Sequence, residues 1–466
     1  MKNSDIHAWD DLSTPFFSLS NSLWALVPLE AWRRGLTVSL GPEARYVITD
    51  GQSRREFRQT RLSGAVQDRI ARESDDKHAT RDLLLAAGLP TPQGRSFTGD
   101  IDLRAVRAYA ESLGFPVCLK PNSWAKGRGV FPKLESVEQF DAALEHLVTT
   151  LGCDDIVVEQ HIRGGALRVF VVGRQVVAVT LAEPANVTGD GSSTVAELVA
   201  EKTAVRRGNP HLRNHALAID ADAERVLAAQ GADASTVPDE GQVLFLREAA
   251  NLAQGGDSLD LTDTLPESIK QIAIDAVDAV EGLSHAGVDL LVEDPSDPGS
   301  QVFINELNPS AGLGGHIYPA YGSQRNVPAA IIDHYFPGTK RRPHSSSWYF
   351  PLNQTSRLLT ARAATMIEMP PMPSISKPAW RRIRIAATSH VLPKLRLAIL
   401  ARLNREDVHG DVGRIADGTF DVLLAGDERP VEQAVSLVRQ LAGRSGGTAK
   451  IASRRAFGTS VGVQNS

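Results

Sequence analysis

Pairs of short apolar segments separated by turn residues are the feature that most constrains this chain. Leu167–Val172 and Gln175–Thr180 flank Gly173-Arg174, and Gly287–Val292 and Gln301–Glu306 flank a turn rich in Asp and Pro. Valine-rich segments of this length with turn signals between them favour antiparallel β-hairpins. Amphipathic helical patterns lie between these segments, so we expect an α/β (α+β) protein built on antiparallel sheets.

Composition narrows the class of protein. The chain has 466 residues, 42% of them apolar and 23% charged, with a formal net charge of −5. These values are typical of a globular protein and give no bias toward nucleic acid or anionic membranes. Cys118 and Cys153 form no metal-binding pattern, the N-terminus has no signal-peptide pattern, and no window has the apolar length of a transmembrane span. We therefore expect a cytoplasmic protein with no nucleic-acid or membrane partner.

Four regions follow from shifts in pattern and composition. We predict an N-terminal α/β region over residues 1–70, a main domain over 71–337, a linker rich in Pro and Ser over 338–378, and a βαββαβ domain over 379–460. Within the main domain, the polar and glycine-containing stretch 183–214 is expected to be a functional or disordered loop.

A metal site is indicated at the end of one apolar strand. Glu306 and Asn308 are separated by one residue, so in a strand their side chains share a face. Carboxylate and amide oxygens suit Mg²⁺, and Asp289 on the neighbouring strand supplies a third oxygen. On local grounds an alternative is equally compatible, in which Asn308-Pro309 opens a turn and Glu306 is a solvated strand end.

Lysines and glycines indicate a phosphate-binding region. Lys120 ends an apolar strand, and the following loop contains Lys126, Gly127 and Gly129. Glycines let such a loop fold closely over phosphates, and lysine supplies a point charge. The pattern matches neither a P-loop nor a dinucleotide-binding fingerprint. A plain strand end at Lys120 and a surface position for Lys77 are the structural alternatives.

Two further polar positions stand before a Gly-Gly pair. Arg247 and Asn251 precede Gly255-Gly256 and could address a phosphate or carboxylate, although local grounds favour a strand end and a turn. His161, Ser310 and His316 form no ordered nucleophile–base set, so nucleophilic hydrolysis is not expected.

Taken in order, these motifs resemble the ATP-grasp superfamily. The order is Asp76-Lys77 before a helix, Leu-Lys-Pro121 with its glycine-containing loop, Val-Val-Glu159, Gly-Val-Asp289 and Asn-Glu-Leu-Asn308. The segments Val187-Thr-Gly-Asp-Gly-Ser-Ser-Thr-Val195 and Asn251–Gly256 are similar to the ATP-grasp module of cyanophycin synthetases and bifunctional glutathione synthetases. The resemblance covers roughly residues 70–337.

This resemblance implies a set of site residues. Nucleotide binding is implied for Lys77, Lys120, Lys126, Gly127, Gly129, Glu159 and Ile162, the last two as the hinge that contacts adenine. Metal binding is implied for Asp289, Glu306 and Asn308. Catalytic positions near the transferring phosphate or the acyl phosphate are implied for Arg168, Arg247 and Asn251.

The chain also departs from these relatives at three substrate-facing or ribose-facing positions. Ala166 stands where an acidic residue usually holds the ribose, and Ser192 stands where lysine usually follows Gly-Asp-Gly. Gly314 replaces an arginine that is common after the metal-binding asparagine. We therefore expect the segment Ser310–His316 to hold a substrate that differs from those of cyanophycin and glutathione synthesis.

The C-terminal region resembles an acylphosphatase domain. The segments Gly410–Gly418 and Phe420–Asp427 carry the pattern, with Arg396 at the position of the phosphate-binding arginine. Arg414 stands where the catalytic asparagine would be. We therefore expect an inactive, ferredoxin-like accessory domain.

The resemblance implies an ATP-dependent carboxylate–amine ligase. Such an enzyme uses ATP with Mg²⁺, or Mn²⁺ in its place, to convert a small carboxylate into an acyl phosphate, and joins it to an amine such as an amino acid or peptide. Homo-oligomers are common among such relatives. The alternatives are an ATP-grasp enzyme that forms no amide and a nucleotide-binding regulatory protein.

Overall fold

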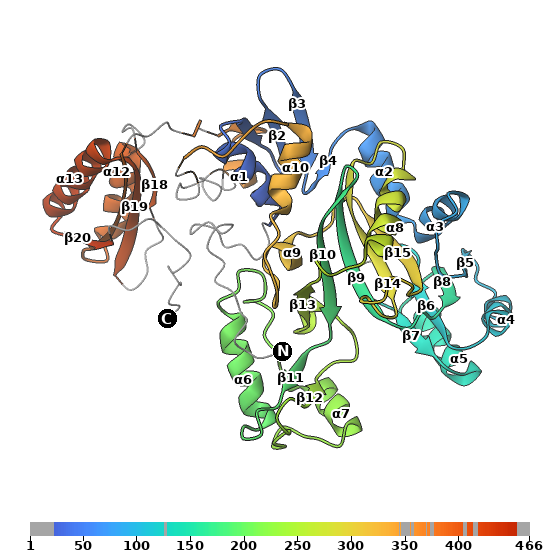
Figure 1. Ribbon diagram of the computed structural model, residues 1–466. Helices are drawn as coiled ribbons and strands as arrows, with labels where there is room; N and C mark the ends of the chain where they lie inside the picture. Colours follow the sequence, from blue (N-terminus) through green and yellow to red (C-terminus); the bar gives the residue numbers. More distant parts are fainter. Residues whose placement is uncertain are drawn as a thin grey trace. The chain divides into compact units, whose positions relative to one another are not determined.

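The structure is a computed structural model, and it describes residues 23–124, 128–343, 345, 355, 358–369, 371–372, 377–403, 408–412 and 418–453. The chain divides into two compact units. One consists of residues 60–334 with 1–7, here called the central unit. The other consists of residues 8–59 and 335–466. Figure 1 shows the elements of each unit. In the part of the chain that the structure describes, no helix is both long and apolar enough to cross a membrane.

The first layer of the central unit is a four-stranded antiparallel sheet in the order β5-β8-β6-β7. Its elements are β5 (Gly94–Thr98), α4 (Leu103–Leu113), β6 (Val117–Pro121), β7 (Phe131–Leu134), α5 (Val137–Glu145), a π-helical turn (His146–Thr150) and β8 (Asp155–Gln160). Val106, Phe140 and Leu147 pack on the apolar side chains of β6 and β8. This core leaves Lys120 and Glu159 as the buried charges of their strands.

The second layer is a five-stranded antiparallel sheet in the order β13-β10-β9-β14-β15. Its elements are β9 (Gly165–Val172), β10 (Gln175–Glu183), β13 (Asp257–Asp260), α8 (Glu267–Asp278), β14 (His285–Val292) and β15 (Val302–Asn308), with α2 (Ala65–Asp75) and α3 (Lys77–Ala86) preceding the first layer in sequence. Both hairpins that the turn residues predicted are present: β9 pairs with β10, and β14 pairs with β15.

Alternation along β9 separates the two faces of this sheet. Leu167, Val169 and Val171 belong to the core cluster that includes Ile269 and Ala273 of α8. Because side chains alternate along a strand, Arg168 and Phe170 point to the opposite face. That face also receives the short helix α9 (Gly314–Ile317), which contacts β10 and β13. Helix α10 (Val327–Tyr335) follows.

An insertion lies between β10 and β13. It consists of β11 (Asn186–Thr188), α6 (Val195–Arg206), α7 (Ala221–Ala229) and β12 (Val243–Phe245), around an apolar cluster of its own. The expectation of a functional or disordered loop over 183–214 is therefore wrong where β11 and α6 lie. Thr194 and Glu197 form a capping box that starts α6. After the insertion, α8 ends at Asp278 and β14 begins at His285.

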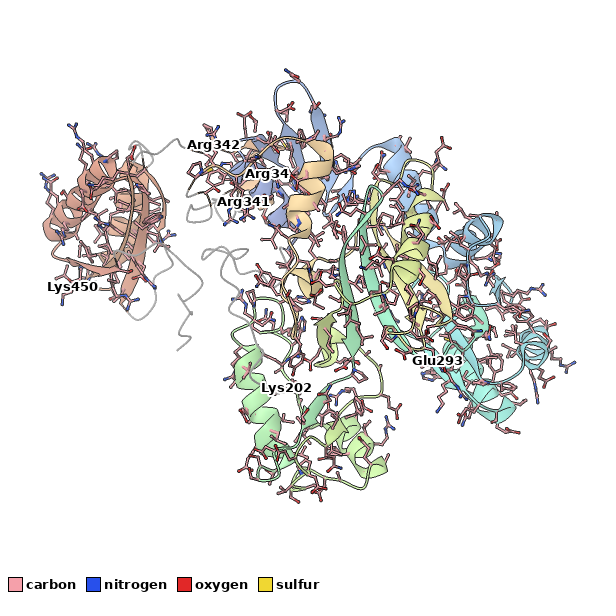
Figure 2. The ribbon with its side chains drawn as sticks, viewed as in Figure 1. Arg34, Lys202, Glu293, Arg341, Arg342 and Lys450 are labelled. Carbon is pink, nitrogen blue, oxygen red and sulfur yellow. The ribbon has the colours of Figure 1, made fainter. Side chains whose placement is uncertain are left out.

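A buried ionic cluster joins the insertion to the second sheet. Asp257 at the start of β13 is 1% exposed and pairs with Arg206 and with Lys202, whose Nζ lies 2.6 Å from Asp257 Oδ2. Arg206 Nη1 also donates to the carbonyl of Gly256 at 3.1 Å. Figure 2 labels Lys202 on α6. One carboxylate is thus the ion-pair partner of two buried cations on α6, and removing its charge would destabilise the docking of that helix.

The second unit contains two sheets. In the first, β16 (Ile367–Glu368), β1 (Thr37–Leu40), β2 (Arg45–Thr49) and β3 (Arg54–Arg58) are neighbours in that order, beside α1 (Leu26–Arg33) and a 3-10 turn (Leu23–Ala25). Glu30 of α1 is buried and pairs with Arg34 and Arg341, both labelled in Figure 2. Strand β4 (Arg61–Leu62) falls in the central unit.

The other sheet has the order β18-β19-β17-β20. Its elements run β17 (Pro378–Ala386), α12 (Leu392–Leu403), β18 (His409–Val412), β19 (Thr419–Asp427), α13 (Glu428–Arg444) and β20 (Thr448–Ser453). This is the βαββαβ succession that the sequence pattern indicated, with a core formed by its own side chains. Arg396 lies on α12 and donates to the carbonyl of Val412 at 2.9 Å, whereas Arg414 lies outside the described residues. The acylphosphatase resemblance stays a prediction.

Replacing Asp257 by Asn should lower the free energy of unfolding by about 3 kcal/mol, because it leaves two buried cations without their counter-charge. Urea denaturation at pH 7 measures this loss. Asp141→Asn is the matched control. Its partner Arg107 is exposed, so that change should cost less than about 1 kcal/mol. Equal losses for the two variants would contradict the role given to Asp257.

Candidate functional site

Lys120 is the buried cation at the end of β6. Its side chain is 8% exposed and pairs with Glu159 on the neighbouring strand β8. Its Nζ also donates to Asn305 Oδ1 of β15 at 3.1 Å, which links the first sheet to the second. Burial disfavours the ammonium, but the Glu159 carboxylate outweighs it and raises the pKa of Lys120. The ammonium is therefore permanently charged at neutral pH and held in one place.

Lys77 reaches the loop that follows Lys120. Asp76 caps α3 by accepting from the backbone N–H groups of His78 and Ala79 at 3.0 and 3.1 Å, which makes Lys77 the first residue of the helix. Lys77 Nζ donates to the carbonyls of Asn122 and Trp124 at 2.8 and 3.2 Å. Both predicted phosphate-binding lysines thus lie near the C-terminal end of β6: Lys120 on the strand itself, and Lys77 against the loop that follows it.

The loop after β6 is described on both sides of residues 125–127. Lys126 and Gly127, which the sequence assigned to phosphate binding, lie outside the described residues. Gly129 has a φ of +69°, and a Cβ there would lie 3.0 Å from Pro121 Cγ. The left-handed backbone and the close approach both explain why glycine stands at this position.

Carboxylates gather where β14 and β15 pair. Asp289 lies opposite Glu306, and Gly287 lies opposite Asn308. Burial, and next the charge of Asp289, raise the pKa of Glu306, while Lys77, Arg168 and Lys120 oppose this rise. These three cationic side chains are therefore close enough to interact electrostatically with the Glu306 carboxylate. The predicted cations and metal ligands converge in one region of the central unit.

Arg168 lies beside these carboxylates on β9. Its Nε and Nη2 donate to Asp289 Oδ1 and Oδ2, both at 2.7 Å, which is the bidentate geometry that aligns a guanidinium with a carboxylate. The charge of Asp289 raises the pKa of Arg168. Arg168 is thus a fixed, permanently charged group at the edge of the acidic pair.

The donor set fits a hard divalent cation. Two carboxylates on adjacent strands repel each other, as the raised pKa of Glu306 records, and a cation between them relieves that repulsion. Asn308 belongs to the same group, since its Nδ2 lies 3.4 Å from Asp289 Oδ2. Two carboxylates with one amide match the oxygen ligands that Mg²⁺ prefers.

Of the two predicted hinge residues, Glu159 lies on β8 and Ile162 lies in the connection between β8 and β9. Glu159 directs its carboxylate to Lys120, and Ile162 is partly buried in the segment after β8. The backbone N–H groups of Gln160 and His161 donate to the carbonyls of Gln93 and Pro116 at 2.8 and 3.2 Å. These bonds fix the path of the chain past Ile162.

Arg247 and Asn251 lie in the region of the insertion, with other partners. Arg247 Nη2 donates to Asp220 Oδ2 at 2.7 Å. Asn251 Oδ1 accepts from the backbone N–H of Ala253 at 2.9 Å and caps the 3-10 turn Leu252–Gln254. The contacts described for them do not reach Lys120, Asp289 or Glu306, so their catalytic roles stay predictions.

Two asparagines of the site escaped the sequence analysis. Asn305 accepts the hydrogen bond of Lys120, and Asn122 Nδ2 donates to Asp76 and Asp155 at 3.2 and 3.1 Å. Asn305 directly precedes Glu306, a predicted metal ligand, and Asn122 directly follows the apolar strand β6. A polar side chain at such a strand end is the signal that identifies them.

The chain is similar to known proteins in sequence and fold. The chain is 35% identical over 266 residues to cyanophycin synthetase of Geminocystis herdmanii, an alignment that covers 56% of this chain and 30% of that protein. It is 33% identical over 269 residues to the glutathione biosynthesis bifunctional protein GshAB of Enterococcus faecalis, covering 56% of this chain and 35% of that protein. The crystal structure of a bifunctional glutathione synthetase from Pasteurella multocida matches with a TM-score of 0.51 and 29% identity, covering 63% of this chain and 41% of that one.

The chain has an ATP-grasp fold. The predicted resemblance to cyanophycin synthetases and bifunctional glutathione synthetases is confirmed. The chain spans about a third of the length of these two curated relatives. No protein-family model matches it. Within the ATP-grasp fold, Lys120 lies on the first sheet, Lys77 begins α3, and the carboxylates lie on the second sheet.

Glu306→Gln tests whether this acidic pair is built for a cation. The change removes like-charge repulsion with Asp289, so without metal the melting temperature should be unchanged or higher. The rise in melting temperature on adding Mg²⁺ with ADP should be lost. Glu293→Gln, on the exposed turn after β14 (Figure 2), should keep that rise. A Glu306→Gln protein that is still stabilised by Mg²⁺ with ADP would contradict the assignment.

Proposed function

We propose that this protein is an ATP-dependent carboxylate–amine ligase that forms an amide or peptide bond and releases ADP and phosphate. The observation that carries the proposal is the convergence of Lys120, Arg168 and the Asp289–Glu306 pair. The hydrogen bond from Lys120 to Asn305 links the sheet of the lysine to the sheet of the carboxylates. Similarity to cyanophycin synthetase and to bifunctional glutathione synthetases supports it.

The phosphates of ATP would be bound by Lys120 of the first sheet and by Lys77 of α3. Lys120, fixed between Glu159 and Asn305, and Lys77 at the start of α3 place two ammonium groups at the β6 end, where the β- and γ-phosphates of ATP would lie. Glu159 and Ile162 would contact adenine. Two cations held in place before the nucleotide arrives reduce the reorganisation that phosphoryl transfer requires.

Metal binding falls to the second sheet. Asp289, Glu306 and Asn308 would hold Mg²⁺, or Mn²⁺ in its place. The ion, when bound, neutralises phosphate charge. Arg168, already held in a fixed plane by Asp289, supplies a guanidinium for the oxygens of the transferring phosphoryl group.

The chemistry then follows in two displacements. An oxygen of the substrate carboxylate attacks the γ-phosphorus, the bond to the bridging oxygen breaks, and ADP leaves with an acyl phosphate formed. The amine nitrogen next attacks the acyl carbon, phosphate leaves, and the amine loses a proton to form the amide. The protein contributes position and charge rather than a covalent nucleophile.

Release of ADP tests this proposal. With a panel of carboxylates and amines, ADP should form only when one of each is present, and mass spectrometry should detect the amide. Lys120→Met should lower kcat/KM at least about a hundredfold, because a fixed charge on the transferring phosphate is lost. Lys450→Met, exposed on β20 (Figure 2), should leave kcat/KM unchanged.

Two outcomes would overturn the proposal. Nucleotide that raises the melting temperature without any ADP release across the panel would favour a nucleotide-binding regulatory protein. ADP release with the carboxylate alone would favour an ATP-grasp enzyme that forms no amide.

A further inference from the structure

A buried histidine lies next to the proposed reaction site without a hydrogen-bond partner. His316 of α9 is 1% exposed, and neither of its ring nitrogens has a partner among the residues that the structure describes. Its ring meets Phe170 of β9 edge-on, with centroids 5.8 Å apart. Buried polar groups are normally paired, so an unpaired imidazole in this place indicates that something else completes it.

The position of His316 relates it to the ligase site. Phe170 and Arg168 are two residues apart on β9 and share a face of the sheet. Arg168 holds Asp289, one of the proposed metal ligands. His316 therefore lies along the same face as the reacting groups, on the side of α9. A substrate that extends from the acyl phosphate toward α9 would meet this ring.

A second histidine fills the space beside α9. A Cβ placed on Gly314 would overlap the ring of His211, so the ring stands where a side chain at 314 would begin. Asn209 fixes this arrangement: its Oδ1 accepts from the backbone N–H of His211 at 2.8 Å, and its Nδ2 donates to the carbonyl of Tyr318 at 3.0 Å. Gly314 is the position at which the resemblance leads us to expect arginine. An imidazole thus replaces a permanent cation.

Both rings are neutral at physiological pH. Burial, followed by the charge of Arg168, lowers the pKa of His316 to about 3. Burial, followed by His215, lowers the pKa of His211 to about 4. A group with so low a pKa cannot hold the proton of an incoming amine, which argues against a general base. A neutral imidazole instead offers one hydrogen-bond donor and one acceptor.

Nearby cations are already matched by carboxylates. Arg325 donates to Asp260 and Asp263, with its Nη2 2.6 Å from an oxygen of each. Arg206 is paired with Asp257. A substrate carboxylate placed against His316 and His211 would therefore be buried without a counter-charge, which is costly. An uncharged polar group meets no such penalty.

We propose that His316, together with His211 packed against Gly314, forms an uncharged recognition subsite for a carboxamide or peptide amide group of the substrate. The amide oxygen or N–H would pair with the free nitrogens of His316, and the two rings with Phe170 would exclude a carboxylate. This inference rests on the proposed ligase function and names the substrate class at the same site.

Binding of matched amino acids to the full chain tests it. Isothermal titration in the presence of Mg²⁺ and ADP compares asparagine with aspartate, and glutamine with glutamate. At least one carboxamide should bind about tenfold or more tightly than its acid, because the acid leaves a charge unpaired. In His316→Phe this preference should disappear. His146→Phe, at an exposed position of the first layer, should keep it.

A double variant tests whether the preference for the carboxamide over the acid can be reversed. His211→Gly with Gly314→Arg removes the ring and places a cation in its space, so aspartate or glutamate should now bind more tightly than its amide. Binding of Mg²⁺ with ADP shows that each variant is folded. If that binding is normal in the natural protein but no carboxamide is preferred, or if His316→Phe keeps the preference, this inference fails while the proposed function stands. Failure to bind Mg²⁺ with ADP would instead refute the proposed function.

Discussion

The ammonium of Lys120 is the interaction on which the rest of the site depends. It lies buried between the carboxylate of Glu159 on its own sheet and the amide of Asn305 on the other. A buried lysine without such partners would lose its proton or destabilise the fold. Its partners therefore do two things at once: they keep the lysine charged, as the proposed phosphate binding requires, and they link the two sheets at the proposed site.

Paired charges recur through the central unit. Arg168 with Asp289, Arg325 with Asp260 and Asp263, and Arg206 with Asp257 each place a guanidinium in a fixed plane. Breaking such a pair in a buried place is far more costly than losing a surface pair. These pairs hold the insertion, α9 and the second sheet in register. Asp289 and Glu306 differ from these pairs, because they are two carboxylates on opposite positions of paired strands. The charge of Asp289 raises the pKa of Glu306, and an added cation would relieve this repulsion.

Local signals predicted much of the fold and part of the site. Gly173-Arg174 marked the hairpin of β9 and β10, and the spacing of Glu306 and Asn308 placed both on β15. The stretch 183–214 is polar and contains glycine, which predicts a loop, yet a capping box starts α6 within it. The hydrogen bond from Lys120 to Asn305 joins residues far apart in sequence, and so does the packing of His211 on Gly314. Periodicity carries no information on such pairs, since they depend on how the two sheets and the insertion pack.

The central claim is that Lys120, Lys77 and the Asp289–Glu306 pair form one site for Mg²⁺ and nucleotide. A crystal structure of the full chain with Mg²⁺ and a non-hydrolysable ATP analogue tests it most directly. We expect an ion at about 2.0–2.1 Å from oxygens of Asp289 and Glu306, with the phosphates against Lys77 and Lys120. Nucleotide bound elsewhere, or phosphates away from both lysines, would contradict the account.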